Sequence, residues 1–231
     1  FLIKNCVEKK ILSYSNFVIA ATANINQNLN SLSDTKTKLI RNGFLYKPKA
    51  KKKINKKIKI GYFGLISEDF SSYRNIRVIY DVIARNEILQ KKLIFEFYGN
   101  NEIKNNDIKN FKSFKFKKNL SLKKALTKMT EMDFLLILHT EKSTAREMVT
   151  SKFYDYLASR TQIINICSGK NEVGNIIKKH KLGYNLNYQS DDIENFFINL
   201  NKNNKKIKWN EKLNFFSRKY QNKKLLQIIE K

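Results

Sequence analysis

Short apolar runs alternate along most of this chain with stretches whose apolar positions recur every three to four residues. The short runs are typical of buried strands, and the recurring pattern is typical of amphipathic helices. From residue 58 onward the predicted strands are 58–63, 93–98, 111–116, 133–139, 161–167 and 184–187. The predicted helices are 75–89, 121–131, 151–159, 171–180, 191–202 and 211–230. Strands that alternate with helices across short loops predict an α/β fold with a Rossmann-like, doubly wound parallel sheet.

The first 44 residues carry a shorter version of the same pattern. Two helices are predicted over 4–14 and 23–32, and two strands over 17–21 and 38–40. A Lys-dense segment with the only proline follows, and the regular alternation starts after it. The sequence therefore predicts 1–44 as the end of an incomplete N-terminal Rossmann-like domain, 45–57 as a linker, 58–210 as a second domain and 211–231 as a C-terminal amphipathic helix. Since the chain opens on Phe1 rather than Met, we expect a truncated start.

Composition limits the classes of protein that this chain can belong to. A hydrophobic content of 42% over 231 residues is enough for a substantial core. The net charge of +26 comes from 46 basic residues, 39 Lys and 7 Arg, against 20 acidic ones. Abundant Lys with few Arg indicates a composition bias rather than a nucleic-acid reader, and attraction to an anionic membrane surface stays open. No apolar run approaches the ~18 residues of a spanning helix. Two isolated cysteines favour a reducing compartment, so we expect a cytoplasmic protein.

Two acids frame the start of the predicted helix 151–159. Glu147 lies in the loop that follows strand 133–139, and Asp155 lies on the early turns of the helix. Thr150, Ser151 and unpaired backbone N–H groups lie between them, and such a helix start attracts anions. Acids that accept hydrogen bonds from sugar hydroxyls, beside an anion-binding helix start, indicate a nucleotide-sugar site. The alternative is two solvated acids that flank an ordinary helix.

A second junction of loop and helix follows the first strand of the predicted second domain. Gly61-Tyr62-Phe63-Gly64 ends that strand, and Arg74-Asn75 precedes the next predicted helix. Gly64 allows close approach of the backbone to a ligand, and Arg74 is suited to a bidentate contact with phosphate. Ligands of such sheets bind at the carboxyl ends of the strands, so both junctions are expected at one edge. The alternative for Arg74 is a surface residue at a helix start.

These residues resemble a known family of enzymes. The run Thr150-Ser151-Lys152-Phe153-Tyr154-Asp155-Tyr156-Leu157-Ala158-Ser159 is similar to the Glu-x7-Glu region of retaining glycosyltransferases of the two-Rossmann (GT-B) type, especially family 4. Asp155 replaces the commoner second Glu, and Arg160-Thr161-Gln162 stands where the family often has Gly-x-Pro. The resemblance covers nearly the whole chain and implies the C-terminal, donor-binding domain of such an enzyme.

The resemblance also implies roles for individual residues. Glu147 would be the catalytic residue that meets the donor sugar hydroxyls, and Asp155 would bind the ribose hydroxyls. The diphosphate would be held by backbone and cationic side chains, and the donor-binding residues would be Gly64, Arg74, Asn75, Val149, Thr150, Lys152 and Asp155. The implied partners are a nucleotide-diphosphate-sugar donor and a glycan or lipid-linked acceptor, in the synthesis of a cell-surface polysaccharide or glycolipid. No metal or other cofactor is implied.

A rival class remains open at this point. It is a non-catalytic, basic Rossmann-like module that holds nucleic acid or an anionic membrane. For the glycosyltransferase, the expected cytoplasmic location leaves open a peripheral attachment to the inner face of the cell membrane. Most of the acceptor-binding half of a GT-B enzyme is missing from this sequence, so we expect the chain alone to be inactive.

His139 is expected to be a buried core residue rather than an acid–base catalyst.

Overall fold

The structure is a computed structural model, and it describes residues 2–32, 34, 36–45, 47–49, 56–70, 72, 74–139, 147–201, 207–208 and 211–230. The predicted linker lies partly, and the loop at 140–146 wholly, outside these described residues.

A six-stranded sheet in the order β10-β9-β8-β3-β5-β7 forms the centre of the molecule. Its strands are β3 (Ile58–Phe63), β5 (Leu93–Tyr98), β7 (Phe114–Lys117), β8 (Phe134–Leu138), β9 (Gln162–Ile166) and β10 (Gly183–Leu186). All neighbouring strands in this sheet pair in parallel. Along the chain, β5 and β7 are added on one side of β3, and β8, β9 and β10 are then added on its other side. This confirms the predicted Rossmann-like, doubly wound parallel sheet.

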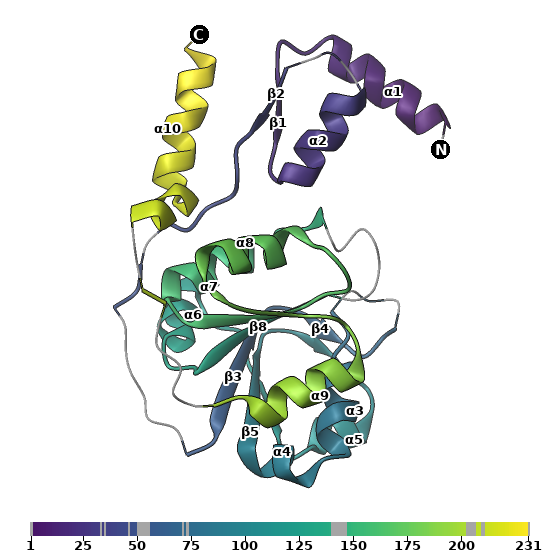
Figure 1. Ribbon diagram of the computed structural model, residues 1–231, viewed down its shortest axis with the longest axis vertical. Helices are drawn as coiled ribbons and strands as arrows, with labels where there is room; N and C mark the ends of the chain where they lie inside the picture. The colour runs from purple at the N-terminus through teal and green to yellow at the C-terminus, as the bar shows by residue number, and fades with distance from the viewer. Residues whose placement is uncertain are drawn as a thin grey trace.

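Helices cover both faces of this sheet (Figure 1). One face is covered by α6 (Leu122–Met129), α7 (Ser151–Ser159) and α8 (Glu172–His180), and the other by α3 (Arg77–Ala84), α4 (Glu87–Lys92), α5 (Asn106–Asn110) and α9 (Ser190–Asn199). Alternate residues of β8 enter two different cores: Leu135 and Ile137 pack on the side of α7, whereas Leu136 and Leu138 pack on the side of α3. A strand covered on both faces needs apolar residues on both, which explains the near-continuous apolar runs.

The N-terminal segment forms a small unit of its own. It consists of α1 (Leu2–Ser13), β1 (Val18–Ala20), α2 (Ala23–Leu32) and β2 (Thr37–Leu39), and β1 pairs with β2 in a separate parallel sheet. A 3-10 helix, η2 (Glu211–Phe216), and α10 (Arg218–Ile229) end the chain beside this unit (Figure 1). The N–H of Phe44 donates to the carbonyl of Phe216 at 3.0 Å, and the N–H of Arg218 donates to the carbonyl of Phe44 at 2.9 Å. The segment that follows β2 is therefore joined to the backbone between η2 and α10.

The predicted helix over 75–89 is wrong, because this stretch holds two helices that begin later. The backbone of Asn86 is extended, and its side-chain oxygen accepts a hydrogen bond from the N–H of Leu89, which starts α4. Asn75 lies outside the helix, and its side chain accepts a hydrogen bond from the N–H of Arg77 at 2.7 Å. Capping by asparagine competes with helix continuation, and the apolar period does not reveal it.

Two further boundaries differ from the prediction, and one pair of strands was not predicted. The strand predicted over 111–116 begins only at Phe114, because a turn follows α5, which the sequence pattern missed. The final helix is broken at Ser217, whose hydroxyl accepts a hydrogen bond from the N–H of Tyr220 and caps α10. A short parallel pair, β4 (Ile66–Ser67) with β6 (Asn101–Glu102), was also missed, since two-residue strands carry no alternation.

Candidate functional site

A cavity of about 430 Å³ lies at the carboxyl end of β3, beside the start of α7. This volume falls within the roughly 300–1,000 Å³ that small-molecule sites occupy. The backbone of Gly64 turns at φ +131°, a conformation that favours glycine, and its N–H donates to the carbonyl of Tyr98 at 2.8 Å. The cavity is lined by Phe63, Gly64, Leu65, Arg74, Leu120, Leu122, Ala125, Met129, Ser151, Lys152 and Asp155.

Lys152 is held inside this cavity by Tyr62 of β3. Its Nζ donates to the Tyr62 hydroxyl at 2.7 Å and lies 3.9 Å from the centre of the tyrosine ring. Burial, together with a smaller contribution from the neighbouring positive charge of Arg74, lowers the pKa of Lys152 to about 7. Within the described part of the chain, no carboxylate lies at salt-bridge distance from Lys152. The cavity therefore carries positive charge that an anion would stabilise.

The start of α7 adds backbone donors to the same cavity wall. Thr150 is the N-cap residue, but its side chain makes no capping hydrogen bond. Its buried Oγ1 has no hydrogen-bond partner among the described residues. The N–H groups in the first turn of a helix without a side-chain cap are open to an anionic ligand, and the helix dipole favours negative charge there. Ser151 and Lys152 of this first turn line the cavity.

Asp155 lies one turn further along α7 and faces both this cavity and a smaller one of about 170 Å³. Burial raises the pKa of Asp155 to about 6, and the positive charge of Arg218 opposes this rise. Tyr156, the next residue, is fully buried, and its hydroxyl accepts a hydrogen bond from the N–H of Phe63 at 2.9 Å. This bond fixes α7 against the end of β3 and so sets the distance between the two junctions.

The structure brings together four of the eight predicted site residues: Gly64, Arg74, Lys152 and Asp155. Glu147 does not line this cavity, and its Oε1 instead accepts a hydrogen bond from Asn28 Nδ2 at 3.4 Å. The side chain of Val149 is buried in the core on the α7 face. The buried side chain of Asn75 serves the start of α3 rather than the cavity.

The sequence pattern did not reveal two contacts that the structure shows. Tyr62 occupies an apolar position of β3 and reads as a core residue, yet its hydroxyl holds Lys152. Glu172 reads as a solvated acid at the start of α8, yet it is buried and contacts residues of the N-terminal segment. His139 is buried, as predicted. The loop at 140–146 lies outside the described residues.

The described residues contain no group of three or more His, Cys, Asp and Glu side chains arranged to hold a metal ion. Among their helices, none has the length and apolar character needed to cross a bilayer.

Comparison with known proteins gives a match in fold alone. No protein family and no curated protein was found to match the chain in sequence. A sucrose-phosphate synthase from Thermosynechococcus elongatus superposes with a TM-score of 0.71 at 13% identity, over 100% of this chain and 61% of its own. HepE of Anabaena, solved with UDP and glucose, gives 0.66 at 14% identity, over 94% of this chain and 64% of its own.

A third solved structure is the lipopolysaccharide outer core galactosyltransferase WaaB, with a TM-score of 0.63 at 13% identity, over 94% of this chain and 62% of its own. This chain therefore spans 61 to 64% of the length of these three proteins. Its six-stranded domain has the Rossmann-like fold of the C-terminal half of GT-B glycosyltransferases.

Proposed function

We propose that this chain carries the donor-binding half of a GT-B glycosyltransferase, which moves a sugar from a nucleotide diphosphate to an acceptor. The observation that carries the proposal is the cavity at the end of β3. It combines two cationic side chains, Arg74 and Lys152, with the uncapped start of α7 and the carboxylate of Asp155. The fold likeness to HepE, which has also been solved with UDP-glucose, supports the same donor class.

The chemistry of such a transfer follows from where negative charge develops. When the bond between the sugar and the diphosphate breaks, charge grows on the leaving diphosphate, and fixed cations and helix-start N–H groups stabilise it. Arg74 and Lys152 would supply the cations, with the backbone of Val149 and Thr150 supplying donors. Asp155 would accept hydrogen bonds from the ribose hydroxyls. This arrangement requires no metal ion.

Glu147 belongs to the proposal as the residue that would meet the donor sugar. It lies outside the cavity that holds Lys152, and it follows a loop that the structure does not describe. Its resemblance to the first acid of the Glu-x7-Glu region supports this role, together with its position three residues before the N-cap of α7. Retention of configuration and membership of family 4 rest on the same resemblance.

The acceptor side is proposed from the N-terminal segment. Residues 1–44 would belong to the acceptor-side domain, since β1 and β2 form a sheet separate from the central one. Exposed apolar side chains on this segment, Val7, Ile11 and Ile19, are suited to packing against more of that domain. The acceptor would be a glycan or a lipid-linked sugar. The Lys-rich surface would favour binding of the protein to an anionic membrane.

Binding of nucleotide tests the proposal. UDP and UDP-glucose should raise the thermal unfolding midpoint of the protein, because a ligand that binds only the folded state stabilises it. A Lys152→Ala variant should lose most of this shift. If neither nucleotide changes the midpoint, while duplex DNA or anionic vesicles bind with a steep dependence on salt, the chain is instead a basic binding module.

A further inference from the structure

Glu172, the first residue of α8, connects the central domain to helix α2 of the N-terminal segment. Both of its carboxylate oxygens accept from the N–H of Ala23 at 2.9 Å, and one accepts from the N–H of Asn24 at 3.3 Å. Arg41 forms a salt bridge with the same carboxylate. Ala23 and Asn24 supply the first two N–H groups of α2, so a side chain 149 residues away caps this helix.

The two charged partners in this contact are well shielded from water. The side chains of Arg41 and Glu172 are 10% and 5% exposed. The N–H of Arg41 also donates to the side chain of Gln221, a buried residue of α10, at 2.9 Å. A buried ion pair with further hydrogen bonds is costly to break from one side, because the remaining charge is left without compensation. The position of α2 is therefore strongly coupled to Glu172.

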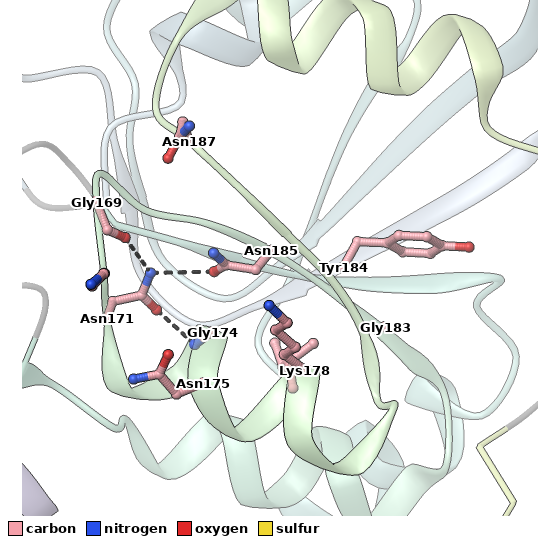
Figure 2. A pocket seen from close by; sticks show the side chains of 11 residues that line it. Gly169, Asn171, Gly174, Asn175, Lys178, Gly183, Tyr184, Asn185 and Asn187 are labelled. Carbon is pink, nitrogen blue, oxygen red and sulfur yellow. Dashed lines mark hydrogen bonds between the residues drawn. The ribbon is translucent and has the colours of Figure 1, made fainter.

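Asn171, the residue before Glu172, is held by hydrogen bonds at the start of α8 (Figure 2). Asn171 accepts from the N–H of Gly174 at 2.7 Å and donates to the carbonyl of Gly169 at 3.1 Å. The amide of Asn165 donates to the side-chain oxygens of Asn171 and Asn185 at 3.0 and 2.6 Å. These bonds fix the residue before Glu172 to β9 and β10.

Helix α2 also reaches the predicted catalytic acid. Asn28, just over one turn beyond the capped end of α2, donates from Nδ2 to Oε1 of Glu147 at 3.4 Å. This distance is at the outer limit for a hydrogen bond, so a displacement of α2 by a fraction of an ångström would break it. One helix thus contacts Glu172 at its start and Glu147 further along.

We propose that Glu172 is a positioning residue for Glu147, acting through α2 and the amide of Asn28. This inference rests on the proposed function, since it assigns to Glu147 a sugar-binding role. Glu172 and Arg41 set the position of α2, and Asn28 then fixes one carboxylate oxygen of Glu147. The other oxygen is left to accept from the donor sugar. The N-terminal segment would in this way take part in recognition of the sugar, without touching the nucleotide.

The first experiment measures hydrogen exchange of backbone amides in the protein without ligand. Glu172→Gln should speed exchange in α2 and also at residues 148–150, by about tenfold at each, since local opening free energies govern exchange. Asn28→Ala, at an exposed position, should speed exchange at 148–150 only. The matched control is Glu194→Gln, which removes an acid paired with Arg85 far from this contact. Unchanged exchange at 148–150 in Glu172→Gln would overturn the inference.

The second experiment compares the dissociation constants of UDP-glucose and UDP by calorimetry. Asn28→Ala and Glu172→Gln should each weaken UDP-glucose by about tenfold, the size of one hydrogen bond to a charged group, and leave UDP unchanged. The double variant should be no worse than either single one, because both act in series. Tighter binding of UDP-glucose by Asn28→Ala would mean that Asn28 blocks Glu147, and would also overturn the inference.

The two proposals fail in different ways. If the wild-type protein binds neither UDP nor UDP-glucose, the donor assignment falls, while the exchange data still decide whether Glu172 controls the backbone around Glu147. If the wild type binds UDP-glucose more tightly than UDP, and the variants keep that ratio, the donor assignment stands and the positioning role falls. Glu172→Asp, which keeps the charge, provides a second variant should Glu172→Gln fail to fold.

Discussion

At the scale of single residues, the candidate site is defined by groups whose charge depends on how deeply they are buried. Lys152 has lost much of its hydration beside Tyr62, and the pKa of its ammonium is lowered to about 7. Asp155, on the same helix, has a pKa raised to about 6 for the same physical reason. Burial disfavours the charged form of each group, so both titrate close to neutral pH. A bound diphosphate would raise the pKa of Lys152 again, because its negative charge stabilises the ammonium.

Proton uptake on nucleotide binding tests this account of Lys152. The free protein has a pKa of about 7 at this group, and a bound diphosphate raises it. Between that value and the ordinary pKa near 10.5, the complex holds more protons than the free protein, so UDP affinity should fall as pH rises above about 7. Calorimetry at pH 8.5 in two buffers of different ionisation enthalpy should show the uptake. Lys152→Met should abolish it, and a wild type without uptake would contradict the account.

Removal of either cation should weaken the donor contact. Arg74→Ala and Lys152→Ala each delete a charge-assisted contact to the diphosphate, worth roughly 1.5–3 kcal/mol, so UDP affinity should fall about ten- to a hundredfold. Lys178→Ala is the matched control, since this lysine lies on α8 and lines a different cavity. If Arg74→Ala and Lys152→Ala behave like Lys178→Ala in a titration with UDP, the diphosphate site is elsewhere.

At the scale of elements, the cavity depends on two strand ends that meet at glycines. Gly64 follows β3, and Gly99 follows β5, with φ of +131° and +135°. A Cβ atom on Gly99 would lie 2.7 Å from the carbonyl oxygen of Gly64. The loop that borders Lys152 therefore packs directly on the next strand end, with no room for a side chain between them.

Gly99→Ala should accordingly lower the free energy of unfolding. The φ of Gly99 is one that residues with a Cβ atom rarely adopt, and the strain and backbone clash should cost roughly 1–3 kcal/mol. Urea unfolding followed by circular dichroism would measure it, with Lys118→Ala at an exposed position of a nearby loop as the control. UDP affinity should fall as well, because the displaced Gly64 borders the cavity. A variant as stable as the control would show that the loop relaxes freely.

The sequence pattern predicted most elements of the central domain but not all of their bounds. All six strands of the central sheet were predicted, because strands covered on both faces carry apolar runs that stand out from their polar loops. Helix 151–159 was predicted with its observed bounds, since its apolar period and polar flanks agree. The bounds of helix 75–89 were predicted wrongly. The side-chain cap of Asn86 divides this stretch into two helices, and such a cap depends on local geometry rather than on hydrophobicity.

At the scale of the whole molecule, the N-terminal segment is fastened to the central domain by polar contacts between distant parts of the chain. Arg41 bonds to Glu172 and Gln221, and Phe44 pairs with the backbone at Phe216 and Arg218. The buried pair of Arg41 and Glu172 joins the start of α2 to the central domain, and Phe44 also packs in the hydrophobic cluster on the α7 face.

The sequence alone predicted the sheet, its coverage by helices and the meeting of Gly64, Arg74, Lys152 and Asp155 at one edge. It also placed Glu147 there, and Glu147 does not line the cavity. These predictions follow from local rules: the period of apolar positions identifies each element, and parallel strands joined by helices put their carboxyl ends together. Only the tertiary structure decided which groups pair: Tyr62 with Lys152, Asn28 with Glu147, and Glu172 with the start of α2. Such contacts, and the pKa of Lys152, depend on packing between distant segments and on how much water that packing removes, which no local pattern encodes.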